Sequence, residues 1–230
     1  MTTSARLSLL TACIALATLL AQASAGASPN DGNTTTAAAT AAETAAEAEA
    51  TGATAAIEKL HAGLLDVMKH ADTLGYPGRF DSLHRIVAES FDLPFMAEKS
   101  VGRHWKKLDD AEKARWLESF QDMTAATYAG RFEGYSGQSF VVLGEEEARH
   151  GTRVVRARII NPDDEDVVLN YRLHETPDGW RVIDVYLNGT VSELALRRSE
   201  YSSVLKRDGF AKLIETIEGK TQDLAAGSLN

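Results

Sequence analysis

Apolar side chains recur at two different spacings along this chain, and the switch between them predicts a helical part followed by a part made of strands. From Ile57 the spacing is three and four residues, as on one face of an α-helix, and it breaks at Gly75-Tyr76-Pro77-Gly78. After Gly130 the spacing becomes two, which is typical of strands with one buried face. The helices are therefore expected first and the sheet second.

Capping residues place the other helices of the first part. One helix is expected over residues 80–90, and Asp92 predicts the start of a short one. Asp109 and Glu112 have the spacing of a capping box and open a long helix that ends near Ala129. The first strand is expected only after these helices.

Four strands and two further helices are expected in the second part. The strands lie near residues 138–143, 152–160, 167–174 and 180–188. Thr176-Pro177-Asp178-Gly179 predicts the turn between the last two strands. Thr190 and Glu193 form a second capping-box pair, which predicts a helix that ends at Asp208-Gly209 and is followed by a final helix.

This order of elements predicts an α+β fold, in which helices cover one face of a curved antiparallel sheet of about four strands. Such a fold is an NTF2-like cone with a helical subdomain. Alternation along the strands assigns the faces. The inner, apolar face is expected to carry Leu169, Tyr171, Leu173, Trp180, Val182, Asp184 and Tyr186. The outer face is expected to carry Arg156, Arg158, Arg172 and Arg181.

The N-terminus has the order of a cleavable secretory signal. Arg6 precedes an apolar run from Leu7 to Leu20, and Ala23-Ser24-Ala25 supplies the small residues of a cleavage site. The run is shorter than the roughly 20 apolar residues that span a membrane. Residues 1–25 are therefore predicted to be removed on export. The rival interpretation is a lipoprotein anchored through Cys13, although Cys13 lies inside the apolar run rather than at its end.

Residues 26–56 differ in composition from everything that follows. They are almost entirely Ala, Thr, Gly, Ser and Glu, with no aromatic or large aliphatic side chain. Such a segment cannot bury enough apolar surface to offset its ordering entropy. We expect residues 26–56 to form a flexible tether and residues 57–230 to form one globular domain.

Charge and cysteine content exclude several classes of function. Removal of the leader would leave 23 basic and 33 acidic side chains and no cysteine. Nucleic acids are held largely through basic contacts to phosphate, so no nucleic-acid partner is expected. The exported domain would have no disulfide, no thiolate nucleophile and no cysteine metal ligand. Since the six histidines are also scattered, we expect neither a metal nor a cofactor.

Catalytic signatures are scarce in this sequence. It contains no G-x-S-x-G motif, no phosphate-binding glycine loop and no pair of histidines four residues apart. The strongest candidate is Asp184 beside Tyr171 and Tyr186, because an acid and a phenol in an apolar cone can transfer a proton. The simpler interpretation is that Asp184 is a satisfied polar residue, bonded to the backbone or to an arginine. We favour this interpretation, so the chain is not expected to be an enzyme.

The four arginines of the outer face also have two interpretations. They form either a solvated surface, neutralised by the acids at residues 145–147, or a docking surface for an acidic partner or an anionic head group.

Several segments of the chain resemble one protein family. They are Phe91-Asp92-Leu93-Pro94-Phe95-Met96-Ala97, Val101-Gly102-Arg103-His104-Trp105, Trp180-Arg181-Val182-Ile183-Asp184-Val185 and Arg197-Arg198-Ser199-Glu200-Tyr201. Together they resemble the MlaC, or toluene-tolerance, family of periplasmic lipid-binding proteins that serve an ABC transporter. The stretch from Asp184 to Leu194 is most similar to the hopanoid-associated branch of that family. The similarity covers about residues 57–223.

The resemblance implies a periplasmic shuttle that carries a phospholipid or a hopanoid-type lipid between the inner and outer membranes. Its implied partners are membrane-bound ABC transporter components and an outer-membrane lipid complex, and we expect the carrier itself to be a monomer. The arginines of the outer face are the candidate docking residues for these partners.

Such a carrier holds lipid tails between its sheet and its helices. Burying a sixteen-carbon tail contributes on the order of 12 kcal/mol, at about 0.8 kcal/mol per CH₂. A charged head-group hydrogen bond adds only about 1 to 3 kcal/mol. An apolar cavity is therefore expected rather than a polar motif. The residues expected to line it are Trp105, Phe120, Tyr171, Leu173, Val182 and Tyr186.

Overall fold

The computed structural model describes residues 52–227, which form an α+β fold. The expectations for the leader, for Cys13 and for the tether up to Thr51 lie outside these residues. The α-helices are α2 (Gly52–Lys69), α3 (Ala71–Ser90), α4 (Leu93–Val101), α5 (Asp110–Arg131), α6 (Glu193–Arg207) and α7 (Gly209–Ala225). Two short 3₁₀ helices are η1 (Gly102–Lys107) and η2 (Arg149–Gly151).

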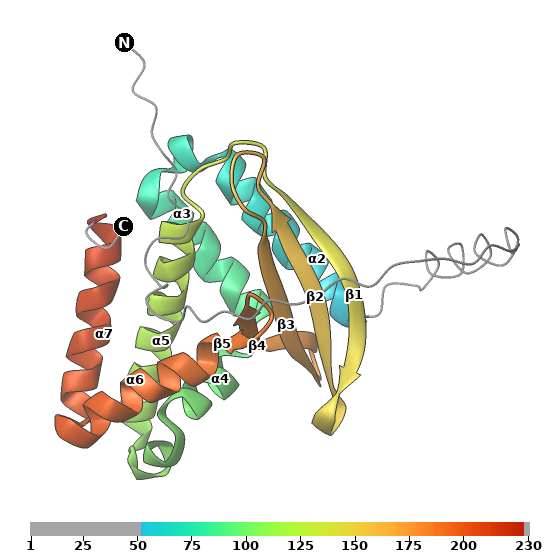
Figure 1. The fold of residues 1–230 in the computed structure, drawn as a ribbon. Coiled ribbons are helices and arrows are strands. Elements are labelled where there is room, and N and C mark those ends of the chain that lie inside the picture. Colours follow the sequence, from blue (N-terminus) through green and yellow to red (C-terminus); the bar gives the residue numbers. More distant parts are fainter. Residues whose placement is uncertain (1–51, 228–230) are drawn as a thin grey trace, which may run out of the picture. The chain divides into compact units, whose positions relative to one another are not determined.

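One antiparallel sheet contains all the strands of this region, and each strand pairs with the next one in the chain. The strands are β1 (Ser139–Ala148), β2 (Thr152–Ile160), β3 (Val167–Thr176), β4 (Gly179–Leu187) and β5 (Val191–Ser192). The curved sheet with helices on one face is therefore confirmed (Figure 1). It has one strand more than expected, because two residues after the last hairpin add β5 to the edge of β4.

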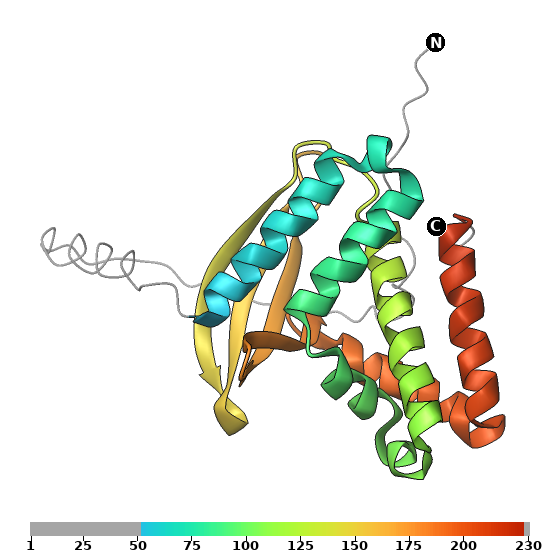
Figure 2. The same ribbon diagram turned by 180° about the vertical axis from the view of Figure 1, so that it is seen from behind.

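The helices stack outward from one face of the sheet. In Figure 2, α2 lies in front of the sheet, and α3, α5 and α7 follow one after another away from it. Helices α4 and α6 lie along the lower side of this row in both views and contact each other. A single apolar core joins the sheet to the helices, and its members include Leu60 of α2, Val87 of α3, Phe120 of α5 and Leu173 of β3. We call the sheet face that α2 covers the inner face.

Polar caps start two of the helices as expected. The Asp92 carboxylate accepts from the Phe95 amide at 2.9 Å, which begins α4. Asp109 and Glu112 form the capping box of α5, with N–H···O distances of 2.8 and 3.0 Å. Phe120 of α5 is buried in the core.

Three helix boundaries differ from the expectation, each for a local reason. Helix α2 begins at Gly52 rather than Ile57, and Ala53 of its first turn is fully buried. The helix from Ile57 was expected to end at Gly75, but α2 ends at Lys69, and Gly75 is a kink inside α3, since only that residue leaves helical geometry (φ 58°, ψ −177°). Ser192, and not Thr190, caps α6, because the residues before it are held in strand β5.

A β-bulge in β4 corrects the face assignment of the last hairpin. Arg172 lies opposite Asp184, but the next residue, Leu173, lies opposite Val182, so Ile183 is an extra residue in β4. An extra residue reverses the alternation beyond it. Val182 therefore faces inward as expected, whereas Asp184 and Tyr186 lie on the outer face, where both had been expected to face inward.

Candidate functional site

A buried hydrogen bond joins α2 to the middle of the inner face. His61 Nε2 lies 3.1 Å from the Tyr171 hydroxyl, and the imidazole stacks on Phe140 of β1 with ring centroids 4.6 Å apart. His61 lies on the apolar stripe of α2, four residues after Ile57, so the helix turns it toward the sheet. The Tyr171 hydroxyl and His61 Nε2 are thus paired with each other inside the fold.

Burial keeps both members of this pair neutral. Burial lowers the pKa of His61 from 6.5 to about 4, so its imidazole carries no charge at neutral pH. Burial, and then the nearby Tyr128 phenol, raise the pKa of Tyr171 well above 10. A neutral, internally bonded pair suits an apolar ligand, because neither side chain offers a charge to a polar one.

A pocket of about 260 Å³ opens beside this pair, between α2 and the edge strand β1. The residues that line it are Glu58, His61, Ala62, Leu65, Ser139, Phe140 and Val142. Sites for drug-sized ligands usually measure about 300 to 1,000 Å³. The pocket therefore provides access to the inner layer, but a larger apolar molecule requires α2 and the sheet to separate further.

Three of the six expected lining residues come together on the inner face. Tyr171, Leu173 and Val182 are at most 1% exposed. Val182 also pairs with Phe91, the residue between α3 and α4, through a parallel bridge. These contacts make the inner face a continuous apolar layer against the helices.

The other three expected lining residues lie elsewhere. Phe120 is buried among the helices, where its ring contacts Trp116 at 6.0 Å between centroids. Trp105 is a half-buried residue of η1, with the Lys113 ammonium 5.9 Å from its ring centroid. Tyr186 lies on the outer face, because the bulge at Ile183 reverses the strand.

A second polar group lies inside the helical layer. The Arg197 guanidinium lies 5.9 Å from the Phe120 ring centroid and hydrogen-bonds Tyr201. Burial opposes its charge, but Tyr201, Glu193 and Tyr128 more than compensate, so the pKa of Arg197 is raised. Burial raises the pKa of Tyr128 to about 12, which leaves a neutral phenol between this arginine and the sheet.

Asp184 of β4 has a structural role, because its carboxylate binds the residues that start α6. Its carboxylate accepts from the Val185 amide at 2.9 Å, from Ser192 Oγ at 2.6 Å and from the Leu194 amide at 3.2 Å. Tyr171 lies on the opposite face of the sheet. The simpler interpretation of Asp184 therefore agrees with the structure, and the proposed acid–phenol pair with Tyr171 is wrong.

The four arginines of the outer face do share one face, as expected. The strand register pairs Arg156 with Asn170 and Arg172 with Val154 and Asp184, and it pairs Arg181 with His174. Arg158 follows Arg156 by two residues and bonds Asp166 at 3.4 Å. We call Arg156, Arg158, Arg172 and Arg181 the arginine face.

Sequence reasoning missed His61 and Phe140 as members of the site. The signal for His61 was its spacing, because it lies in phase with Ile57 and Leu64 on the buried stripe of α2. A polar residue at such a position needs a partner inside the fold. The partner, Tyr171, is 110 residues away, and only the folded chain brings the two together.

Within residues 52–227, no three His, Cys, Asp or Glu side chains gather in a way that could hold a metal ion. No helix in the same range has both the length and the apolar character to cross a membrane.

Two comparisons with known proteins bear on this geometry. The family model described as MlaC protein matches residues 58–219. The solved structure of a phospholipid-binding protein from Ralstonia solanacearum, in complex with a phospholipid, is similar to this structure with a TM-score of 0.67 and 21% sequence identity. The match covers 75% of this chain and 98% of that chain, and at this identity the likeness concerns the fold.

Proposed function

Because this chain belongs to the MlaC family, we propose that it is a lipid carrier that holds the apolar part of its cargo between α2 and the inner face of the sheet. The observation that carries the proposal is the neutral His61–Tyr171 pair inside an otherwise apolar layer, next to a pocket open to solvent. The phospholipid bound to the protein of the same fold supports this choice of cargo.

In such a site, most of the binding free energy comes from burying the lipid tails. Each buried CH₂ contributes about 0.8 kcal/mol, so one acyl chain outweighs any single polar contact. The inner layer is already packed around Tyr171, Leu173 and Val182. Cargo therefore enters by displacing α2 from the sheet, and the pocket beside His61 is where that separation begins. Since Tyr186 faces outward and Trp105 lies on η1, we leave both out of the proposed lining.

We further propose that the carrier works in the periplasm as a shuttle between the inner and outer membranes. It would exchange lipid with an ABC transporter in one membrane and with a lipid complex in the other. The arginine face is the proposed docking surface, since it gathers four cations on one side of an acidic chain. The stretch from Asp184 to Leu194 supports the hopanoid-associated branch, so the cargo is a phospholipid or a hopanoid-type lipid.

Mass spectrometry of the natively purified protein tests this function directly. We expect retained lipid in the wild type, and the mass of that lipid distinguishes a phospholipid from a hopanoid. Ala62→Trp would fill the pocket without touching the core, because Ala62 is an exposed pocket residue of α2. This variant should retain less lipid.

Ala55→Trp is the matched control for this experiment. Ala55 is exposed on the same helix and lines no part of the pocket. Equal lipid retention in the two variants would contradict the position of the site. A wild-type protein that never contains lipid, even after incubation with lipid vesicles, would contradict the carrier function itself.

A further inference from the structure

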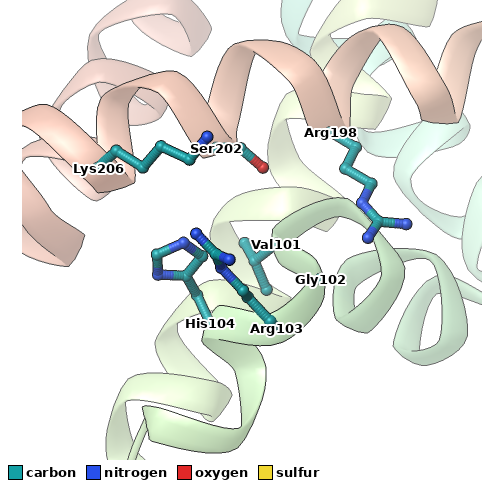
Figure 3. A pocket seen from close by; sticks show the side chains of 7 residues that line it. All are labelled: Val101, Gly102, Arg103, His104, Arg198, Ser202 and Lys206. Carbon is teal, nitrogen blue, oxygen red and sulfur yellow. The ribbon is translucent and has the colours of Figure 1, made fainter.

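A second pocket, of about 240 Å³, lies between η1 and α6 and is lined mainly by basic side chains. Figure 3 shows both walls: α6 contributes Arg198, Ser202 and Lys206, and the end of α4 and the start of η1 contribute Val101, Gly102, Arg103 and His104. On α6, each of these residues follows the previous one by four positions, which places all three on one face of the helix. We call these seven residues the basic pocket.

The backbone at Gly102 lets the two walls approach each other. Gly102 has φ 56°, a left-handed conformation that favours glycine. A Cβ atom at this position would lie 3.0 Å from Arg198 Nη2. A side chain here would require the flexible end of Arg198 to shift, so the glycine permits this close approach.

The cations of the basic pocket have no counter-charge. Arg103, Arg198 and Lys206 form no ion pair with any residue from 52 to 227, and no Asp or Glu lines the pocket. Some other cations of this acidic chain are bridged, as Arg153 is to both Glu145 and Glu147 at 3.1 Å. Uncompensated cations that converge on a concave surface concentrate anions there.

His104 adds a polar group that lacks a partner. Its Nε2 atom is buried and makes no hydrogen bond within the described part of the chain. Most buried polar atoms are bonded, so an isolated one indicates a missing partner. Burial, and then the charges of Arg103, Lys107 and Lys206, lower the pKa of His104. The groups that act on this imidazole are thus all cations.

Packing explains only part of this cluster. Arg198 lies beside Gly102 at the carboxyl end of α4, where a cation is stabilised by the helix dipole. Lys206 lies in the last turn of α6, where the dipole of that helix likewise stabilises a cation, whereas Arg103 is exposed and follows the end of α4. Helix dipoles therefore do not explain why all three cations line one pocket.

We propose that the basic pocket binds a phosphate group, either on a lipid head group or as a free phosphate. Guanidinium groups bind phosphate oxygens through paired, charge-assisted hydrogen bonds, and Ser202 and Lys206 add further donors. The pocket is smaller than sites for drug-sized ligands, so it takes a head group rather than acyl chains. The inference does not depend on lipid carriage, because free phosphate is a sufficient ligand.

Titration with inorganic phosphate at constant ionic strength tests the site, with the side-chain NMR signals of His104 as the local reporter. We expect a saturable shift of these signals. The double variant Arg198→Ala/Lys206→Ala should bind at least about tenfold more weakly, since each charge-assisted hydrogen bond is worth about a factor of ten or more. Both positions are exposed, so the fold should persist, and thermal unfolding checks this.

The control is Arg85→Ala/Arg149→Ala, which removes two exposed arginines that line no part of the pocket. This variant should bind phosphate like the wild type. If both double variants weaken binding equally, or if the shift of His104 never saturates, the proposal is wrong and the cluster is only a solvated basic surface.

Vesicles identify the source of the phosphate. The full chain is mixed with phosphatidylglycerol-containing vesicles, with and without inorganic phosphate as competitor. Vesicle binding that phosphate displaces, and that the pocket variant loses, assigns the site to a lipid head group. Phosphate binding without vesicle binding assigns it to a soluble phosphate. Capture of an acidic peptide by the pocket, with no response to inorganic phosphate, would overturn the proposal in favour of a protein partner.

Discussion

The two faces of the central sheet are built from the same strands and yet have opposite chemistry. On β3, Tyr171 and Leu173 point inward and are almost completely buried, whereas Arg172 between them points outward. Arg172 donates to Thr152 Oγ1 at 3.0 Å and to the Arg149 carbonyl at 3.3 Å. One strand can therefore serve an apolar interior and a charged surface at once, and adjacent residues are natural probes of the two.

The largest difference should be in stability. Leu173→Ala removes a fully buried side chain and should lower the free energy of unfolding by about 2 to 5 kcal/mol. Arg172→Ala, one residue earlier, should cost only about 1 kcal/mol, because Arg172 is half-buried and a single hydrogen bond contributes little net stability. Urea denaturation of the two lipid-free variants measures both values. Equal costs would mean that the inner face is not the packed layer described above.

The second-largest difference between the two faces should be in how stability depends on pH. His61 has a pKa near 4 in the folded protein and 6.5 when exposed, so protons bind the unfolded chain more readily between these values. Stability from this group is complete above pH 6.5 and is lost as the pH falls toward 4. The loss should reach about 3 kcal/mol, at 1.36 kcal/mol per pKa unit.

Denaturation curves between pH 7 and pH 4 measure this effect. His61→Gln should flatten the curve in that window. His174→Gln is the outer-face control, since His174 bonds Asp92 at 2.8 Å and lies away from the inner layer. If the free energy of unfolding of His61→Gln falls between pH 7 and pH 4 as steeply as that of the wild type, another group causes the acid sensitivity.

A smaller effect is expected from single hydroxyl groups. Tyr171→Phe leaves His61 Nε2 without its partner in an apolar layer, which should cost about 1 to 3 kcal/mol. Tyr186→Phe is the matched outer-face change and should stay within about 0.5 kcal/mol. Thermal unfolding of the two variants compares them. A larger loss in Tyr186→Phe would reverse the assignment of the faces.

The smallest effect concerns the arginine face and appears in kinetics rather than in stability. Arg156→Ala/Arg172→Ala should slow lipid transfer to acceptor membranes that contain the transporter by several-fold at low salt and hardly at all at high salt. The control Lys69→Ala/Arg85→Ala removes two exposed cations of α2 and α3. If the control slows transfer as much, net charge explains the effect and the arginine face has no special role.

Local signals in the sequence predict much of this fold. The strand 152–160 matches β2 in full, and the Asp109–Glu112 box starts α5 as expected. These features depend on residues close together in the chain, such as a capping side chain and the amide three residues later. The inward direction of Tyr171, Leu173 and Val182 follows from alternation alone, as long as the strand is regular.

Features that depend on tertiary contacts could not be predicted in this way. The bulge at Ile183 reverses Asp184 and Tyr186, and neither a turn nor a glycine stands next to Ile183 in the sequence. Thr190 looks like a cap, but pairing of Val191 with Leu187 delays α6 to Ser192. The basic pocket joins residues nearly a hundred positions apart, so its charges look scattered along the sequence.

The two edges of the sheet differ in their exposure to other molecules. On one side, β5 and the Phe91–Val182 bridge cover β4, and the Asp92 amide adds a bond of 2.9 Å to the Val182 carbonyl. On the other side, β1 pairs only with β2 among the described residues, and Val141 and Leu143 are 42% and 49% exposed.

A bare, partly apolar strand is a template for aggregation, and two features of β1 oppose that outcome. The strand is interrupted by the bulge between Val142 and Gly144, and the exposed carboxylates of Glu146 and Glu147 follow immediately. If two copies met along this edge, their glutamates would repel each other. The bulge would also interrupt the hydrogen bonds between the two strands. The irregular end of β1 therefore disfavours pairing between the edge strands of two copies.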